Sequence, residues 1–443
     1  MKQVLVFGAG KSATVLINYL LGHAAEHNWH VTIADNDVEL AVAKLKGHAH
    51  GSAVFFNADE DELREELIKQ SHLVISMLPA AMHVPVAKAC VKYGKHLLTA
   101  SYVSPEMAAL DTEAKEKGIV LLNEMGLDPG IDHMSAMQII HKIKEEGGVI
   151  TSFKSCTGGL IAPESMDNPW GYKFTWNPRN VILAGKGTAR YLHNGKLKFI
   201  PYERLFTQTE TVEIPTIGTL EGYANRDSLH YIEEYGLEGI GTMFRGTLRY
   251  KNYCRAWNCF IKLGLTDDSF VIPHSKTLTY IELLAMLLPE EVAFNDAEIA
   301  HFLGLENAPE IFEMLKWTGI FSNYKIGIAN ATPAMVLQHL LEEKWKLNQG
   351  DLDLVVMVHE FIYTLGNQQK KTTSTLVLKG DDEHITAMAK TVGLPLAIAA
   401  KLLLTNKIVL SGVIIPTVET VYAPVLKELA SLGIAFNERE ELL

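Results

Sequence analysis

The sequence contains few cysteines and none of the spacings that would give them a structural role. Four occur among 443 residues: Cys90, Cys156, Cys254 and Cys259. They form no CxxC pair and no Cys/His pattern typical of zinc, so we expect no metal centre. Their scarcity excludes a disulfide-dense secreted scaffold and is typical of the reducing cytosol. The sequence therefore predicts a cytoplasmic protein.

Long apolar runs and an excess of positive charge are also missing. No stretch of about 18 uninterrupted apolar residues occurs, so we expect no membrane span. The apolar N-terminus is interrupted by Gly8–Ser12 and lacks a cleavage pattern, which disfavours a signal peptide. Lys and Arg number 40 against 52 Asp and Glu, a net charge of −12 that argues against a nucleic-acid partner. Hydrophobic residues make up 48%, which excludes intrinsic disorder.

A glycine-rich turn stands near the N-terminus between an expected strand and an expected helix. Residues 3–7 are apolar, and apolar residues then recur at helical spacing from Val15. Between them lies Gly8-Ala9-Gly10-Lys11-Ser12-Ala13, a G-x-G-x-x-A dinucleotide fingerprint. Gly8 allows the tight turn, Gly10 lets the pyrophosphate approach, and Ala13 permits close helix packing. We expect cofactor contacts from Gly8, Ala9, Gly10, Lys11 and Ser12.

A phosphate-binding NTPase loop is the alternative interpretation of Gly10-Lys11-Ser12. That motif requires a glycine five residues before Gly10, where this chain has Leu5, so the interpretation is disfavoured.

Asp35 follows the expected strand 31–34 and lies 25 residues after Gly10. A carboxylate at this place in the fingerprint binds the ribose 2′-hydroxyl and repels a 2′-phosphate. Asn36 and Asp37 add no cation that could receive a phosphate. We therefore expect NAD(H) as the preferred cofactor and NADP(H) as the alternative. A solvated aspartate at a strand end is the competing interpretation of Asp35.

Strand-like and helix-like segments alternate through the first 122 residues. This alternation predicts an α/β fold, an N-terminal Rossmann-type doubly wound parallel sheet. Expected strands are 52–56, 72–77, 96–99 and 119–122, and expected helices are 60–70, 82–93 and 105–117. Ligands bind at the carboxyl ends of such strands. A crevice is therefore expected beside Asn57, Leu78-Pro79, Ser101-Tyr102 and Leu127-Asp128.

A series of sequence blocks further along resembles the saccharopine dehydrogenase family, in its glutamate-forming branch. The resemblance covers nearly the whole chain. Its blocks are Leu98–Pro105, Asn123–His133, Gly158–Ser165, Asn168–Trp176, Asn225–Ser228 and Arg245–Tyr250.

The resemblance implies an oxidoreductase of lysine metabolism that acts on a secondary amine. Saccharopine gives up hydride from the carbon beside its amine, and the imine is hydrolysed to glutamate and aminoadipate semialdehyde. The reverse direction makes saccharopine. A homodimer is also implied. The alternatives are a carboxynorspermidine or carboxyspermidine dehydrogenase, and a catalytically silent nucleotide-binding sensor.

The resemblance also assigns roles to individual residues. Ser101, Tyr102 and Asp128 contact the substrate, and Asp128 and Tyr102 are the candidate catalytic acid–base groups. Substrate carboxylates are expected to bind Arg226, Arg245, Gly246 and Thr247. Further cofactor contacts are expected from Asn57, Leu78, Pro79, Leu127, Asp128, Pro129 and Phe174.

Several of these residues also have an ordinary structural interpretation. Asp128-Pro129-Gly130 is a common turn sequence, and Phe174 could be a core aromatic residue. Arg249 suits a substrate role and a surface salt bridge equally. Cys156 is expected to be a small buried residue rather than a catalytic one. His133 suits either a proton carrier or a packed side chain.

The rest of the chain is expected to form a second α/β domain with a helical insertion. The predicted Rossmann domain comprises 1–126 and 405–443, because the tail returns to it in the family. The predicted substrate domain comprises 127–273 and 348–404, and the helical insertion 274–347. A hairpin is expected around the polar turn Gly366–Lys371.

Overall fold

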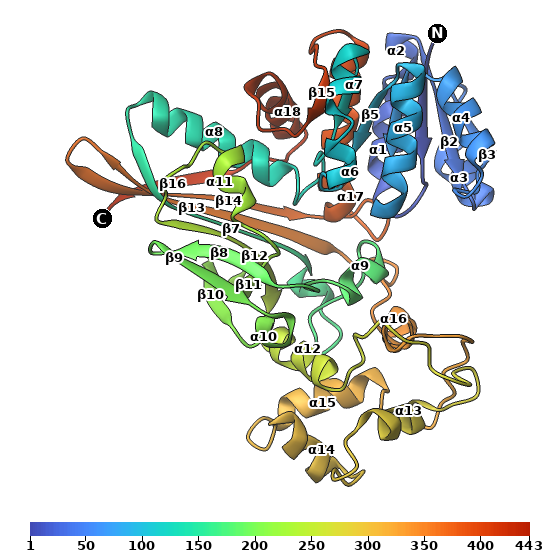
Figure 1. The fold of residues 1–443 in the computed structure, drawn as a ribbon, viewed down its shortest axis with the longest axis vertical. Coiled ribbons are helices and arrows are strands. Elements are labelled where there is room, and N and C mark those ends of the chain that lie inside the picture. The colour runs from blue at the N-terminus through green and yellow to red at the C-terminus, as the bar shows by residue number, and fades with distance from the viewer. The chain divides into compact units, whose positions relative to one another are not determined.

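The computed structural model describes all residues from 1 to 443 (Figure 1). The chain forms two compact units, of which the first combines two separate stretches of the sequence and the second is one continuous stretch. Unit 1 comprises Met1–Ile150 and Ile362–Leu443, and unit 2 comprises Thr151–Phe361. The C-terminal segment therefore belongs to the same unit as the N-terminal segment.

Unit 1 is built on a seven-stranded sheet in which all neighbouring strands pair in parallel. The strand order is β15-β6-β5-β4-β1-β2-β3. The order reverses between β1 and β4, and such switch points bind ligands at the strand carboxyl ends. The predicted doubly wound sheet is confirmed. The strands are β1 (Lys2–Phe7), β2 (Trp29–Asp35), β3 (Gly51–Phe55), β4 (Leu73–Ser76), β5 (His96–Thr99), β6 (Val120–Leu122) and β15 (Gly412–Ile414).

Helices follow the strands of unit 1, and α3, α6 and α17 begin at side-chain caps. Asp37 accepts a hydrogen bond from the Leu40 N–H at the start of α3, and Ser104 accepts one from Met107 before α6. The helix expected over 105–117 is divided into two short helices. The helices are α1 (Ala13–Gly22), α2 (Ala24–His27), α3 (Val38–Leu45), α4 (Asp61–Gln70), α5 (His83–Tyr93), α6 (Pro105–Ala108), α7 (Asp111–Glu116), α8 (Ile131–Glu145), α17 (Ala387–Leu404) and α18 (Glu419–Ser431).

Helix α17 is the apolar core helix of unit 1. It is long and apolar enough to cross a membrane by length and composition, but 83% of that window is buried inside the protein. It packs against α1 at Gly393, where an added Cβ atom would lie 2.9 Å from the backbone nitrogen of Leu16. Its largely apolar composition therefore reflects burial on several sides.

Unit 2 contains a mixed sheet in the order β10-β11-β12-β7-β13, with the β8–β9 hairpin beside β12. Strand β12 pairs antiparallel with β11 and parallel with β7. Strand β13 runs on into unit 1, where a turn at Gly366-Asn367 leads to β14 (Gln368–Lys379). The bounds are β7 (Val149–Ile161), β8 (Ala189–His193), β9 (Lys196–Ile200), β10 (Thr209–Ile214), β11 (Gly218–Ala224), β12 (Thr242–Tyr250) and β13 (Asp353–Leu365).

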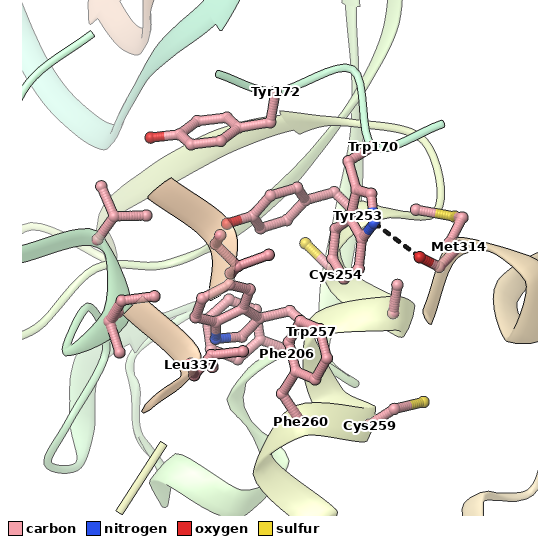
Figure 2. Packing of buried hydrophobic residues seen from close by; sticks show 14 of the residues in the cluster. Trp170, Tyr172, Phe206, Tyr253, Cys254, Trp257, Cys259, Phe260, Met314 and Leu337 are labelled. Atoms are coloured by element: carbon pink, nitrogen blue, oxygen red, sulfur yellow. Dashed lines mark hydrogen bonds between the residues drawn. The ribbon is translucent and has the colours of Figure 1, made fainter. Parts of the chain in front are cut away.

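The core of unit 2 is an aromatic cluster between this sheet and its helices (Figure 2). Trp170 stacks on Phe260 with ring centroids 5.3 Å apart, and its indole N–H donates to the Met314 carbonyl at 3.0 Å. Burying aromatic side chains is a large source of stability, since Phe or Trp to Ala typically costs about 3–5 kcal/mol. The helices are α9 (Pro178–Ile182), α10 (Tyr202–Leu205), α11 (His230–Glu234), α12 (Tyr253–Lys262), α13 (Tyr280–Leu287), α14 (Asp296–Leu303), α15 (Pro309–Thr318) and α16 (Pro333–Lys344).

Candidate active site

The glycine-rich turn connects β1 to α1 at the switch point of the unit 1 sheet. Gly8 has φ +96°, and a Cβ atom there would lie 3.1 Å from the Met77 carbonyl oxygen. Its N–H donates to the Ala34 carbonyl at 2.9 Å, which fixes the turn against β2. Gly10 faces open space, with nothing within 4 Å of an added Cβ atom. The turn thus has the shape that a pyrophosphate needs in order to approach the backbone.

Asp35 points toward this turn from the end of β2. One carboxylate oxygen accepts the Ala9 N–H at 2.5 Å, and the other accepts the Asp37 N–H at 2.8 Å. Burial lowers the pKa of Lys44 below its usual value, and the nearby negative charge of Asp35 opposes part of this shift. Lys44 in turn donates to the Thr14 hydroxyl of α1. The carboxylate therefore holds the turn and the start of α3 in place.

A cavity of about 290 Å³ lies beside the ends of β3 and β4. Its lining includes Phe56, Leu78 and the largely buried Arg64, whose Nε has no hydrogen-bond partner. Asn57 and Pro79 are exposed at the same strand ends. A partly open space with an unsatisfied donor at the carboxyl ends of the strands suits a polar heterocyclic ligand.

Tyr102 and Asp128 meet in unit 1. The Tyr102 hydroxyl donates to the Asp128 carboxylate at 3.3 Å, and both residues are half-buried. Asp128 sits in a tight turn between Gly126 and Gly130, closed by the Gly126 N–H donating to the Pro129 carbonyl. A Cβ atom on Gly130 would lie 2.0 Å from the Gly126 oxygen, so this position requires glycine. Leu127 and Pro129 are buried within the turn.

Ser101 is held by a histidine that the sequence reasoning did not single out. The ring of His83, at the start of α5, contacts the Ser76 hydroxyl at 2.8 Å and the Ser101 hydroxyl at 2.8 Å. Burial lowers the pKa of His83 to about 4, so the ring is neutral near neutral pH. The neutral ring donates through one nitrogen and accepts through the other, and so can pair with both the Ser76 and the Ser101 hydroxyl.

In unit 2, Arg245 projects from β12 onto an aromatic ring. Its guanidinium carbon lies 4.3 Å from the centroid of Tyr231, and the residue is 2% exposed. Its backbone N–H donates to the Ser228 hydroxyl at 2.9 Å. Gly246 follows, where an added Cβ atom would lie 2.9 Å from the Cys156 sulfur and 2.8 Å from Phe244. Gly246 therefore contributes close backbone packing, and the half-buried Thr247 follows it.

Arg226 lies at the exposed tip of a loop that is anchored on both sides. Asp227 accepts the Leu229 N–H at 2.9 Å and the Arg190 guanidinium at 2.5 Å. Ser228, two residues after Arg226, accepts from Arg245. Arg226 itself adopts a left-handed backbone with φ +43°. The hydrogen bond from the Arg245 N–H to Ser228 therefore joins the segment that carries Arg226 to strand β12, which carries Arg245.

Two other candidates lie in the core of unit 2. Phe174 is 1% exposed and packs edge-on against Trp345 at 5.2 Å. Arg249 is also buried, with its guanidinium 5.1–5.9 Å from the rings of Tyr172, Tyr223 and Tyr253. The surface salt bridge considered for Arg249 is wrong, since aromatic rings surround its charge. A cofactor role for Phe174 stays a prediction.

Comparison with known proteins identifies the family. A model described as the saccharopine dehydrogenase NADP binding domain matches residues 4–122, and one described as the saccharopine dehydrogenase C-terminal domain matches residues 126–434. The chain belongs to the saccharopine dehydrogenase family.

Relatives within the family match the chain from end to end. The NADP(+), L-glutamate-forming saccharopine dehydrogenase of Schizosaccharomyces pombe is 32% identical, with 99% of each chain covered. The solved apo structure of the L-Glu-forming enzyme from Saccharomyces cerevisiae has a TM-score of 0.87 at 31% identity, covering 100% of both chains. Alpha-aminoadipic semialdehyde synthase of Mus musculus is 35% identical, and the match covers 100% of this chain. The chain spans about half the length of that relative, namely 48%.

The expectation of NAD(H) preference from Asp35 is wrong. The family model is an NADP binding domain, and the fungal relatives are named as NADP(+) enzymes. Both oxygens of the carboxylate accept backbone N–H groups, so Asp35 stabilises the turn and the start of α3 whichever cofactor binds. Sequence spacing located Asp35 correctly but could not show what its oxygens bind.

Proposed function

We propose that the protein is an L-glutamate-forming saccharopine dehydrogenase that uses NADP(H). The observation that carries this proposal is the Tyr102–Asp128 hydrogen bond at the ends of the unit 1 strands, in a chain related over its full length to such enzymes. A phenol and a carboxylate in contact form an acid–base pair suited to amine chemistry.

Residues of unit 1 fit a dinucleotide cofactor. The open face at Gly10 and the N-terminus of α1 would hold the pyrophosphate. The cavity lined by Phe56, Leu78 and Arg64 would hold part of the nucleoside, and Lys44 and Lys11 are the cations proposed for the 2′-phosphate. The bound cofactor supplies a hydride acceptor in the direction of saccharopine oxidation.

Asp128 and Tyr102 are proposed to handle the protons of the reaction. The secondary amine must lose its proton before hydride can leave the neighbouring carbon, and Asp128 is the proposed acceptor. Tyr102, as the hydrogen-bond donor to Asp128, orients this carboxylate and shares its proton exchange. Water attack on the imine and collapse of the carbinolamine require proton transfers that the same pair can provide.

Arg245 and Arg226 are proposed to bind carboxylates of the substrate. The guanidinium fork pairs with a carboxylate through two parallel hydrogen bonds, and its charge persists at any physiological pH. The Tyr231 ring and the Ser228 hydrogen bond hold Arg245 in place in advance. A tricarboxylate substrate would thus meet local cations although the protein carries a net charge of −12.

The proposal is tested by mixing purified protein with saccharopine and NADP⁺ and following absorbance of the reduced cofactor. We expect turnover, with glutamate formed in proportion to NADPH. An Arg245→Lys variant should raise KM for saccharopine and leave the dissociation constant for NADPH unchanged. Absence of turnover with saccharopine, combined with oxidation of carboxynorspermidine, would contradict the proposal.

A further inference from the structure

Glu124 is a buried carboxylate at the junction of two loops in unit 1. One loop, 100–104, carries Tyr102, and the other, 126–130, carries Asp128. Glu124 is 3% exposed and has a left-handed backbone with φ +56°. A buried charge and a left-handed non-glycine residue both cost conformational or solvation free energy, and such costs concentrate at functional sites.

Both oxygens of Glu124 are used, and each reaches a different segment. Oε1 accepts the N–H of Val103, the residue after Tyr102, at 3.0 Å. Oε2 lies 2.8 Å from Nε2 of His133, which is fully buried in the first turn of α8. The backbone N–H of Glu124 also donates to the Ser101 carbonyl at 3.1 Å. One side chain therefore connects the Tyr102 loop to α8.

The Asp128 turn is attached to the same helix. Asp132, next to His133, accepts the Gly130 N–H through Oδ1 at 2.6 Å. The Asp132 N–H donates to the Leu127 carbonyl at 3.1 Å, and the Ile131 N–H donates to the Gly126 carbonyl. The first turn of α8 thus fixes the turn that presents Asp128. Hydrogen bonds run from Val103 through Glu124 to His133, and the neighbouring Asp132 hydrogen-bonds the Asp128 turn, so both loops are attached to the first turn of α8.

We propose that Glu124, acting with His133, is a positioning residue that sets the Tyr102–Asp128 geometry. This inference rests on the proposed function, since its value to the enzyme is the alignment of the proton-transfer pair. The 3.3 Å hydrogen bond between Tyr102 and Asp128 joins two separate loops, so its length depends on how those loops are positioned relative to each other. Misplacing a catalytic group by about 1 Å can lower the rate by about a hundredfold.

The test uses Glu124→Gln, which preserves shape and leaves one carbonyl oxygen to serve two donors. We expect kcat for saccharopine to fall at least tenfold, with KM and the NADPH dissociation constant within twofold of wild type. The exposed Glu116 on α7 provides the matched control, and Glu116→Gln should leave kcat unchanged. In a Tyr102→Phe background, Glu124→Gln should add little further loss, because the interaction it sets is already missing.

A second readout does not depend on the substrate. In a crystal structure of Glu124→Gln, the Tyr102 Oη to Asp128 Oδ1 separation should exceed hydrogen-bonding distance. If Glu124→Gln fails to bind NADPH, the kcat loss and the Tyr102–Asp128 separation are measured in His133→Gln instead, with the same expected results. An unchanged Tyr102–Asp128 separation overturns the inference, as does an equal kcat loss with and without Tyr102→Phe. Failure of the wild type to oxidise saccharopine would instead reject the proposed function, and the crystallographic comparison would still decide the positioning role.

Discussion

At the scale of single residues, the proposed chemistry depends on buried and half-buried polar groups that are held by specific partners. Tyr102 meets Asp128, His83 meets Ser101, and Ser228 meets the backbone of Arg245. None of these hydrogen bonds joins residues adjacent in sequence. Tertiary contacts therefore determine which groups these side chains meet.

Asp128→Asn should lower kcat by about 10²–10⁴-fold, the usual contribution of general acid–base catalysis. The amide keeps the size of the side chain but cannot accept the amine proton. The dissociation constant for NADPH, measured by fluorescence titration, should change little. Turnover equal to that of wild type would remove Asp128 from the catalytic assignment.

Lys44→Ala should weaken NADPH much more than NADH. The ammonium is proposed to face the 2′-phosphate, and a hydrogen bond to a charged group contributes about 1.5–3 kcal/mol, or at least tenfold in affinity. The measurement is steady-state kcat/KM with each cofactor, compared between wild type and Lys44→Ala. Equal loss with both cofactors would show that Lys44 only supports α1 through Thr14.

His83 makes stability depend on pH. Burial lowers the pKa of His83 from 6.5 to about 4, so between these values the unfolded chain binds a proton that the native protein does not. The free energy of unfolding therefore rises with pH in this window and falls as pH drops from 6.5 toward 4. The effect of this group reaches roughly 3 kcal/mol by pH 4.

Denaturant unfolding of His83→Asn at several pH values measures that contribution. The variant should lose less stability than wild type between pH 6.5 and 4, and the exposed His384 offers a control through His384→Asn. Identical pH dependence of wild type and His83→Asn would contradict the assigned shift.

At the scale of elements, strands and helices of unit 1 were predictable because each carries its own signal. Buried strands such as β1 and β4 are short apolar runs, and Gly8 and Gly10 mark the turn that follows β1. Strand β16 (Asn437–Leu442, NEREEL) carries no such signal, since it is charged and exposed. It is held by antiparallel pairing with β14, which no local pattern reveals.

The candidate site was predictable only in part, for the same reason. The glycine-rich turn is a local pattern, and Ser101, Tyr102, Asp128, Arg226 and Arg245 were located through family blocks. His83 and Glu124 act through partners distant in sequence, and Asp35 was misjudged because the direction of its carboxylate depends on Ala9 and Asp37. A histidine among apolar residues at the start of α5 was the available signal for His83.

Contact between α1 and α17 gives a prediction at this scale. Gly393→Ala places a methyl group 2.9 Å from the Leu16 nitrogen and 3.2 Å from the Ser12 carbonyl oxygen. Because backbone atoms cannot move aside easily, overpacking should cost about 1–3 kcal/mol, more than the helix propensity gained. Displacing the start of α1 should also weaken NADPH binding.

Chemical denaturation and NADPH titration test this expectation. Gly22→Ala in α1 is the matched control, because nothing lies within 4 Å of its added Cβ atom. A Gly393→Ala variant as stable as Gly22→Ala would contradict the expectation, because α1 and α17 would then accommodate the methyl group without loss of unfolding free energy.

At the scale of the whole molecule, the chain distributes its proposed tasks between two units. Unit 1 holds the glycine-rich turn and the Tyr102–Asp128 pair, and unit 2 holds Arg226 and Arg245. The tail returns to complete unit 1, where β15 pairs with β6 and α17 packs against α1. The predicted division into Rossmann domain, substrate domain and helical insertion stays a prediction, as do the homodimer and the cytoplasmic location.

In the proposed reaction, hydride leaves the lysine side of saccharopine, so that glutamate is released intact. The most direct measurement uses saccharopine dideuterated at the ε-carbon of its lysine skeleton, with NADP⁺ and the purified protein. We expect deuterium in the reduced cofactor and glutamate as the amino-acid product. Unlabelled NADPH accompanied by lysine and 2-oxoglutarate would contradict it.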